Sequence, residues 1–269
     1  MREIAHFRRV VLAHTRMSAR HTLPWRQTHD PYRILVSEIM LQQTQVERVI
    51  PFYLAFLKKF PTVQALANAS LDDVLTEWSG LGYNRRAKML HECAKTVTER
   101  YGGKVPRDFA ALVSLPGIGA YTAGAIRAFA FNEPGVFIET NIRAALIHHF
   151  FPRAKKVSDD RLKPLLESLE SAPTLCGPRE WYAALMDYGA HVKRMYPNPS
   201  RRSAHHTKQS KFEGSLRQVR GAILKAITRK TPLKDVREAY AKKFQEAMES
   251  LVRDGLIAFP KGSTQTVRS

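Results

Sequence analysis

Glu38 is the acidic residue whose neighbours in the sequence most favour proton chemistry. It lies in the run ILVSEIML, where apolar residues precede and follow it. A helix through this run would place the carboxyl group against a largely dry surface, and burial raises the pKa of a carboxylic acid. Such a group can donate a proton near neutral pH. The alternative is an exposed acid in the first turn of a helix that begins after Ser37.

Glu139 is a second acid with two possible uses. It follows the apolar run VFI and precedes Thr140 and Asn141. An acid at such a junction can simply cap the helix that follows. Beside a sugar, however, two carboxyl groups divide the work of breaking a glycosidic bond, because the reaction passes through an oxocarbenium-like state. One group protonates the leaving group, and the other stabilises the cation or handles water.

The segment LPGIGAYTAGAI, residues 115–126, predicts a tight turn between two helices. Gly117 and Gly119 would let backbone amides and the N-terminus of the next helix approach a phosphate closely. Such a turn would hold DNA without reading its sequence. A single Gly-x-Gly turn is also a common way to end a helix, which is the alternative.

The elements that must position these residues are mostly helical. Apolar residues recur at helical spacing along most of the chain, and strand signals are scarce. Helix-capping residues are frequent, for example Ser70 before LDDVLTEW and Asp159 before RLKPLLESL. The sequence therefore predicts a mainly α fold.

The composition changes after residue 192, where the chain becomes basic and rich in Pro, Ser and His. We interpret residues 1–192 as one domain and residues 193–214 as a basic linker. Residues 215–269 predict three short helices and a Gly-containing tail, an order that resembles a winged helix-turn-helix DNA-binding module. A small helical cap without DNA contact is the alternative.

The charge balance favours a polyanionic partner. Lys and Arg number 43 against 24 Asp and Glu, for a formal net charge of +19, which suits nucleic acid or an anionic membrane. No stretch approaches the roughly 18 apolar residues of a membrane span, and residues 1–10 carry charges where a signal peptide is apolar. We therefore expect a cytoplasmic protein without a membrane partner.

Cys93 and Cys176 are the two cysteines of the chain. Two thiols are too few for a structural zinc site or a thiolate-bound iron cluster. We expect both cysteines to be reduced, and we expect no metal site and no cofactor.

Together these segments resemble a known family. Residues 23–192 are similar to the catalytic domain of the MutY family of adenine DNA glycosylases, in the endonuclease III-like superfamily. The resemblance implies a two-lobed helix-hairpin-helix fold and an enzyme that flips a base out of duplex DNA and cuts its bond to the sugar. The matching segments occur in the family's order and at its spacing: LPWR, DPYRILVSEIMLQQTQV, FPTVQALANASLDDVLTEWSGLGYNRRA, YGGKVP, LPGIGAYTAGAI, IETNIRAAL and ALMDYGA.

The resemblance implies catalytic roles for four residues. Glu38 would protonate the departing base. Glu139 falls where the family has an aspartate, and Asn141 lies beside it. Tyr121 falls where bifunctional relatives carry a Schiff-base lysine, which implies a monofunctional enzyme without β-lyase chemistry.

The resemblance also implies contacts with DNA. Gln43 and Tyr83 would wedge into the space left by the flipped nucleotide, although a surface amide and plain aromatic packing are the alternatives. Trp25, Arg26 and Thr44 would line the base pocket, and aromatic packing is again the alternative for Trp25. The remaining DNA-binding residues that we expect are Gln42, Gly117, Gly119 and Thr122.

The sequence departs from the family in three places. The family binds a four-iron cluster through four cysteines after the MDxGA segment, whereas residues 193–210 contain none, so we expect no iron–sulfur cluster. Typical family members carry a C-terminal Nudix-like domain that recognises 8-oxoguanine. We expect the short helical tail here not to form such a domain, so selectivity for that lesion does not follow from the resemblance. Glu139 and Thr140 replace an Asp-Gly pair, and one extra methylene moves the carboxylate by about 1.5 Å, a shift that matters in catalysis.

The sequence predicts a monomeric, nucleoid-associated base excision repair enzyme that acts on double-stranded DNA with a mismatch or lesion. Adenine opposite guanine or 8-oxoguanine is the first substrate to expect, and removal of thymine or uracil from G mismatches is the alternative. A non-catalytic DNA-binding protein is a third possibility. Glu38 beside the QQT segment argues against it, because a binding module needs no acid in a dry pocket.

Overall fold

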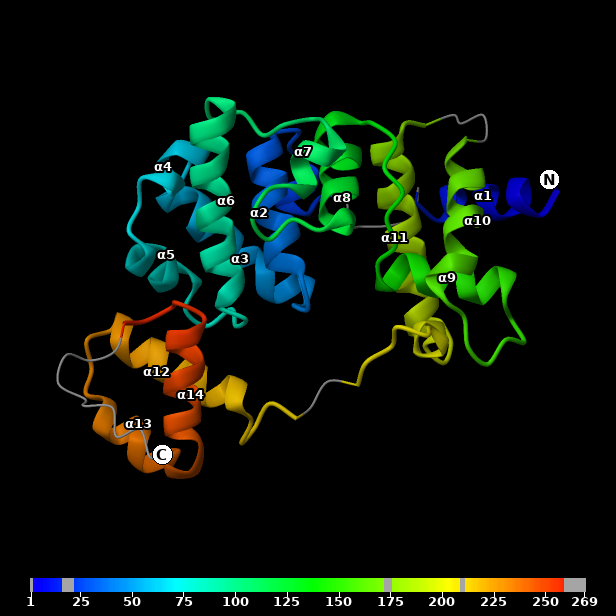
Figure 1. Ribbon diagram of the computed structural model, residues 1–269. Helices are drawn as coiled ribbons and strands as arrows, with labels where there is room; N and C mark the ends of the chain where they lie inside the picture. Colours follow the sequence, from blue (N-terminus) through cyan, green and yellow to red (C-terminus); the bar gives the residue numbers. More distant parts are fainter. Residues whose placement is uncertain (1, 16–21, 172–175, 209–210, 259–269) are drawn as a thin grey trace. The chain divides into compact units, whose positions relative to one another are not determined.

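The computed structural model describes residues 2–15, 22–171, 176–208 and 211–258. Within these ranges the regular elements are helices, with one isolated parallel bridge between Val157 and Ser203. The predicted mainly α class is confirmed. The chain forms two compact units, which combine segments differently from the predicted division at residues 193 and 215. Unit 1 comprises residues 1–42 and 104–208, and unit 2 comprises residues 43–103 and 209–269 (Figure 1).

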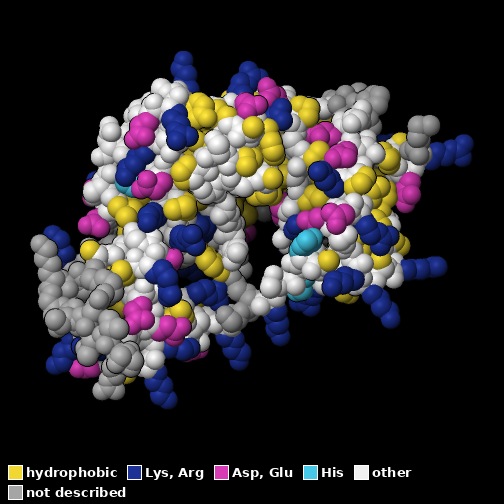
Figure 2. Space-filling model, viewed as in Figure 1, with side chains coloured by type: hydrophobic (Ala, Val, Ile, Leu, Met, Phe, Trp, Pro, Cys, Tyr) yellow, Lys and Arg dark blue, Asp and Glu magenta, His cyan; other side chains and the backbone are white. Residues whose placement is uncertain are grey.

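Two helices that share a hydrophobic core form a main part of unit 1. Helix α9 (Thr140–Phe150) packs against α11 (Pro178–Met195), and α1 (Arg2–Thr15) lies on the same α11. The other helices of unit 1 are η2 (Pro24–Arg26), α2 (Pro31–Leu41), α7 (Phe109–Val113), α8 (Ala120–Phe131), α10 (Asp159–Ser171) and η3 (Pro199–Arg202). Many Lys and Arg side chains, dark blue in Figure 2, project from the visible face of each unit.

Helix α2 is buried on nearly all sides, which explains its apolar sequence. The Asp30 carboxylate caps it by accepting hydrogen bonds from the amides of Tyr32 and Arg33, at 2.8 and 3.3 Å. Pro31 occupies the first helical position, where its missing N–H costs nothing. Every residue from Ile34 to Met40 is buried, and α2 packs against α8. A polar side chain in this stretch therefore faces protein rather than water.

The predicted helical hairpin is formed by α7 and α8. Asp108 caps α7 by accepting a hydrogen bond from the amide of Ala111 at 2.8 Å. In the turn, Gly117 has a φ of 76°, a left-handed conformation that favours glycine. Gly119 is the N-cap of α8 and supplies no side chain to the first amides of that helix. Those amides are left without partners inside the helix.

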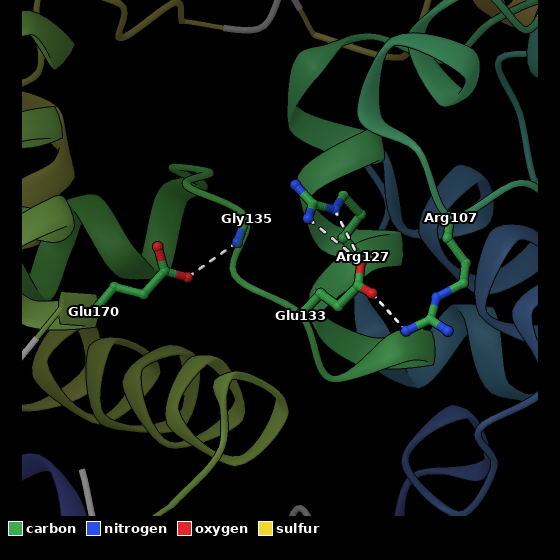
Figure 3. Close-up of polar contacts among 5 residues, drawn as sticks. All are labelled: Arg107, Arg127, Glu133, Gly135 and Glu170. Carbon is green, nitrogen blue, oxygen red and sulfur yellow. Dashed lines mark hydrogen bonds and ion pairs between the residues drawn. The ribbon is translucent and has the colours of Figure 1, made fainter. Parts of the chain in front are cut away.

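The loop between α8 and α9 is anchored at two points (Figure 3). Glu133 binds two guanidinium groups, with Arg107 at 2.5 Å and Arg127 at 3.3 Å. The amide of Gly135 donates a hydrogen bond to Glu170 at 3.0 Å. A Cβ at Gly135 would lie 2.7 Å from the carbonyl oxygen of Gly124 on α8, so the loop approaches that helix backbone directly. This loop delivers the start of α9 to a fixed place.

The segment predicted to be a linker is largely packed onto unit 1. Helix α11 continues to Met195, and η3 follows it. The Arg202 guanidinium donates hydrogen bonds to the carbonyl oxygens of Phe151, Pro152 and Ala154, at 2.7, 3.0 and 3.0 Å. The composition of this polar segment could not reveal that it packs onto unit 1, because its order depends on the hydrogen bonds of a single arginine.

Unit 2 joins a central part of the chain to its C-terminal helices. Its first part contains α3 (Val46–Lys59), α4 (Val63–Ala67), α5 (Leu71–Trp78) and α6 (Arg85–Tyr101). The C-terminal module contains α12 (Leu216–Thr228), α13 (Leu233–Ala239) and α14 (Ala241–Arg253), as three predicted helices required. Helix α12 packs against α5 and α14. The predicted Gly-containing tail falls partly on residues 259–269, which lie outside the described residues.

Candidate active site

Glu38 is buried in unit 1, with 4% of its surface exposed. The pKa of its carboxyl group is raised from a usual value of 4.5 to about 7, mainly by desolvation; a hydrogen bond from Tyr121 opposes the shift, and the charge of Glu139 adds to it. Glu38 can therefore hold a proton near neutral pH. The surroundings match the dry surface that the sequence predicted, and they make this carboxyl group a suitable general acid.

Tyr121 lies in the first turn of α8 and touches Glu38 directly. Its hydroxyl group donates a hydrogen bond to Oε2 of Glu38 at 3.2 Å. Burial, followed by the charges of Glu38 and Glu139, raises the pKa of the phenol well above its usual range, so the phenol stays neutral. The ring packs edge-on against Phe137, with the ring centres 5.5 Å apart. Tyr121 thus orients the acid and carries no amine.

Glu139 caps α9, as one of the two sequence interpretations required. Its Oε1 atom accepts hydrogen bonds from the amides of Asn141 and Ile142, at 2.7 and 2.8 Å. Its Oε2 atom accepts one from the Asn141 side chain at 3.1 Å. The side-chain oxygen Oδ1 of Asn141 in turn accepts a hydrogen bond from Nζ of Lys193 at 3.1 Å. Capping does not exclude a second role, because the carboxylate is also close enough to Glu38 to affect its pKa.

The two acids have different electrostatic surroundings. Desolvation raises the pKa of Glu139 too, but two backbone amides and the positive charges of Lys193 and Arg143 oppose the shift. Glu38 has one hydrogen-bonding partner, Tyr121, that favours its ionised form. Glu139 is therefore the easier of the two to ionise. Two nearby acids with different proton affinities are the arrangement that divides acid and electrostatic roles.

Gly189 and Lys193 shape this site from α11, and sequence reasoning missed both. A Cβ at Gly189 would lie 1.9 Å from the carbonyl oxygen of Asn141, so only glycine lets α11 approach the start of α9 this closely. Lys193 follows four residues later and therefore shares that helix face. This spacing was a usable signal, but we assigned Lys193 to the linker.

Arg26 and Trp25, the predicted lining of the base pocket, lie in η2. The Arg26 guanidinium forms a two-pronged ion pair with Asp187 on α11, at 2.6 and 2.7 Å. Asp187 is 2% exposed, and Trp25 is 7% exposed. The ion pair ties η2 to α11. The sequence did not suggest Asp187 as the partner, because 161 positions separate the pair.

The residues predicted to bind DNA in unit 1 lie at the starts and ends of two helices. Gly117 and Gly119 are exposed beside the first turn of α8. The Gln42 side chain, at the end of α2, donates a hydrogen bond to the Thr122 hydroxyl at 3.4 Å. Thr122 follows Tyr121 in the chain. The N-terminus of α8 therefore carries both the predicted phosphate contact and Tyr121, the hydrogen-bonding partner of Glu38.

A second group of predicted residues lies in unit 2. Gln43 is exposed with a φ of 55°, and Tyr83 has a φ of 51°, conformations that non-glycine residues rarely adopt. Arg86, which sequence reasoning missed, donates hydrogen bonds to the Thr44 hydroxyl at 3.1 Å and to the carbonyl of Gly82 at 3.0 Å. Burial lowers the pKa of Arg86 to about 10. The structure thus brings Thr44 and the Tyr83 turn together.

The donor atoms of the chain do not fit the iron–sulfur cluster that the resemblance implied. Residues 193–210 contain no cysteine, and the chain has two in all. Cys93 is buried on α6 in unit 2. Among the described residues, no three His, Cys, Asp or Glu side chains gather in a way that could hold a metal ion. The described helices also include none with the length and apolar character of a membrane span.

The hairpin and the buried acid beside it define a class of helix-hairpin-helix repair proteins. The model of the HhH-GPD superfamily base excision DNA repair proteins matches residues 36–170, which is half of the chain. The protein therefore belongs to this family, and the predicted helix-hairpin-helix fold is confirmed.

Similar curated proteins are named adenine DNA glycosylase. The one from Buchnera aphidicola subsp. Baizongia pistaciae is 40% identical over 172 residues, which are 64% of this chain and 48% of that protein. The one from Mycolicibacterium smegmatis is 43% identical over 179 residues, 65% of this chain and 59% of the relative. The chain thus spans about half the length of the curated relatives that it matches.

Two solved structures share the fold. A thermostable thymine-DNA glycosylase is 29% identical with a TM-score of 0.63, and the alignment covers 70% of this chain and 87% of the other. Endonuclease III in a non-covalent complex with DNA is 17% identical with a TM-score of 0.51, over 82% and 86% of the two chains. The second similarity concerns the fold alone.

Proposed function

We propose that this protein is a DNA glycosylase that hydrolyses the bond between a flipped base and its sugar. The observation that carries the proposal is the buried Glu38, whose pKa of about 7 suits a proton donor at neutral pH. Membership of a base excision DNA repair family supports the substrate class.

In the proposed reaction, Glu38 donates its proton to a nitrogen atom of the base. The electrons of the C1′–N bond leave with the base, and the sugar becomes an oxocarbenium-like cation. The ionised Glu139, held by three hydrogen bonds from Asn141 and Ile142, stabilises that cation. Water then adds to C1′, and its proton returns to the Glu38 carboxylate.

The residue at the start of α8 supports hydrolysis without strand cleavage as part of this proposal. Tyr121 has a hydroxyl group where Schiff-base chemistry requires an amine. Borohydride should therefore trap no covalent complex with DNA, and strands should break only after alkali treatment. Lys193 brings an amine to the site through its hydrogen bond to Asn141. A trapped complex that disappears in Lys193→Ala would therefore refute the monofunctional proposal.

Adenine opposite guanine or 8-oxoguanine is the first proposed substrate, because the curated relatives carry the name adenine DNA glycosylase. Thymine opposite guanine is the second candidate, because a thymine-DNA glycosylase of known structure is 29% identical. A panel of end-labelled duplexes with A, T or U opposite G, and A opposite 8-oxoguanine, tests both. Cleavage confined to one base identifies the substrate, and no cleavage in the whole panel refutes the proposal.

Each unit contributes, in this proposal, its own contacts with duplex DNA. Gly117, Gly119 and the first amides of α8 bind a phosphate, and Gln43 and Tyr83 fill the space of the flipped nucleotide. Trp25, Arg26, Gln42, Thr44 and Thr122 border the base. The net charge of +19 supports a DNA partner, with the C-terminal module adding phosphate contacts.

The protein acts in this proposal as a monomer in the cytoplasm, on the nucleoid, and without iron. The purified protein should be colourless, because two cysteines cannot supply four thiolate ligands. Stoichiometric iron in a metal analysis would refute this part of the proposal.

A further inference from the structure

The turn that carries Tyr83 is held in an unusual backbone conformation. It follows α5 and precedes α6, and three of its residues, Gly80, Gly82 and Tyr83, have φ values of 104°, 87° and 51°. The indole of Trp78 donates a hydrogen bond to the carbonyl of Gly82 at 3.0 Å. A non-glycine residue persists at such a φ only when its surroundings hold it there.

Arg217 of the C-terminal module reaches the end of the Tyr83 side chain. Its Nη1 atom donates a hydrogen bond to the Tyr83 hydroxyl at 2.6 Å. Its guanidinium carbon also lies 5.6 Å from the centre of the Tyr83 ring, and that of Arg86 lies 5.3 Å from it. Both distances are within the range of cation–π attraction. The hydrogen bond joins residues 134 positions apart in the chain.

The module is attached to both helices that flank this turn. Helix α12, which carries Arg217, packs against α5 (Figure 1). Lys88 on α6 donates a hydrogen bond to the carbonyl of Asp254, just after α14, at 2.9 Å. Within the module, Arg220 on α12 forms an ion pair with Asp254 at 2.5 Å. The module that carries Arg217 is therefore bound to the same two helices that flank the turn with Tyr83.

We propose that Arg217 is a positioning residue that holds the Tyr83 side chain ready to fill the space left by the flipped base. The inference rests on the proposed function. It assigns the C-terminal module a part in base flipping, in addition to any phosphate contacts. A guanidinium bound to the phenol oxygen restricts both the direction and the rotation of the ring, so less ordering remains to be done when DNA binds.

The contact itself is tested first without DNA. Arg217→Ala, Tyr83→Phe and the double variant form a double-mutant cycle, measured by urea unfolding. Because a hydrogen bond to a charged group is stronger than a neutral one, we expect a coupling of about 10-fold in the unfolding equilibrium constant. Additive single effects would show that the two side chains do not act together and would overturn the proposal.

Base flipping is tested next with a fluorescent adenine analogue. All proteins carry Glu38→Gln, which blocks excision, and the duplex holds 2-aminopurine opposite guanine, whose fluorescence rises when the base leaves the stack. At saturating protein, the fluorescence gives the equilibrium constant between stacked and flipped base. We expect Arg217→Ala to lower this constant about 10-fold, which corresponds to the loss of one charged hydrogen bond. Tyr83→Phe, which leaves the module untouched, should cause the same loss, and the double variant should add little.

Lys225→Ala is the matched control, because Lys225 is an exposed cation in the last turn of the same helix. It should leave the fluorescence unchanged. The proposal is overturned if Arg217→Ala and Lys225→Ala behave alike. It is also overturned if Arg217→Ala reduces base flipping as much in the Tyr83→Phe background as in the parent, and also lowers the salt slope of DNA binding by about 0.9. Arg217 would then be a phosphate contact. If the Glu38→Gln parent itself gives no fluorescence rise, adenine as the proposed substrate fails rather than this inference, which the double-mutant cycle still tests.

Discussion

Replacing Glu38 with glutamine should stabilise the folded protein while it abolishes base excision. The carboxyl group has a usual pKa of 4.5 and a pKa of about 7 in the structure. Between these pH values the folded state keeps a proton that the unfolded chain has lost, so the native acid makes stability fall as pH rises. At 1.36 kcal/mol per pKa unit, the cost above pH 7 is about 3 kcal/mol. Glutamine cannot ionise and removes this cost.

Urea unfolding at pH 4.5 and at pH 8 measures the effect. The difference in the free energy of unfolding between Glu38→Gln and the parent should grow by about 3 kcal/mol from the lower to the higher pH. Glu167→Gln, which removes an exposed acid from α10 of the same unit, is the control and should show no such growth. Parallel curves for Glu38→Gln and the parent would refute the argument that burial sets the pKa of this acid. Excision by the parent should also decline above pH 7, as Glu38 loses its proton.

Four further predictions concern the residues around Glu38 and the C-terminal module. Glu139→Gln should slow single-turnover excision at least about 100-fold. Glu139→Asp should also be slower, because its shorter side chain retreats by about 1.5 Å; parent-like rates would disprove both. Lys193→Met should shift the acidic limb of the rate–pH profile to higher pH, because Lys193 lowers the pKa of Glu139, and an unmoved limb would contradict this. Gly189→Ala should cost about 1–3 kcal/mol by urea unfolding, whereas Gly221→Ala on α12, with nothing within 4 Å of its Cβ, should be neutral or stabilising. Deleting residues from 213 onward should flatten the salt dependence of DNA binding, and equal salt slopes would make the module a scaffold.

Local patterns in the sequence predicted the burial of Glu38 and the helix positions of several other candidate residues. Apolar residues on both sides of Glu38 predicted a buried acid, and its 4% exposure agrees. Glu139 was correctly placed before a helix, but the sequence could not decide between a cap and a second acid. The structure shows that it caps α9. Gly117 and Gly119 were correctly placed between two helices.

Long-range partners were out of reach. Lys193, Asp187 and Arg217 each bind a residue more than fifty positions away, and no periodicity records such a pairing. The packed segment after Met195 was missed for a related reason: its order comes from Arg202, which binds the carbonyl groups of another loop. The amino-acid composition of a segment indicates how polar it is, but it does not predict which residues the segment contacts.

The division of the chain into units has a consequence for protein synthesis. Unit 2 consists of residues 43–103 and 209–269, so its two parts leave the ribosome with more than a hundred residues of unit 1 between them. Until the second part emerges, the face of α5 that α12 covers lies open. A nascent chain can thus pack the whole of unit 1 before Tyr83 meets Arg217. Docking of the last three helices is the final step in the assembly of unit 2.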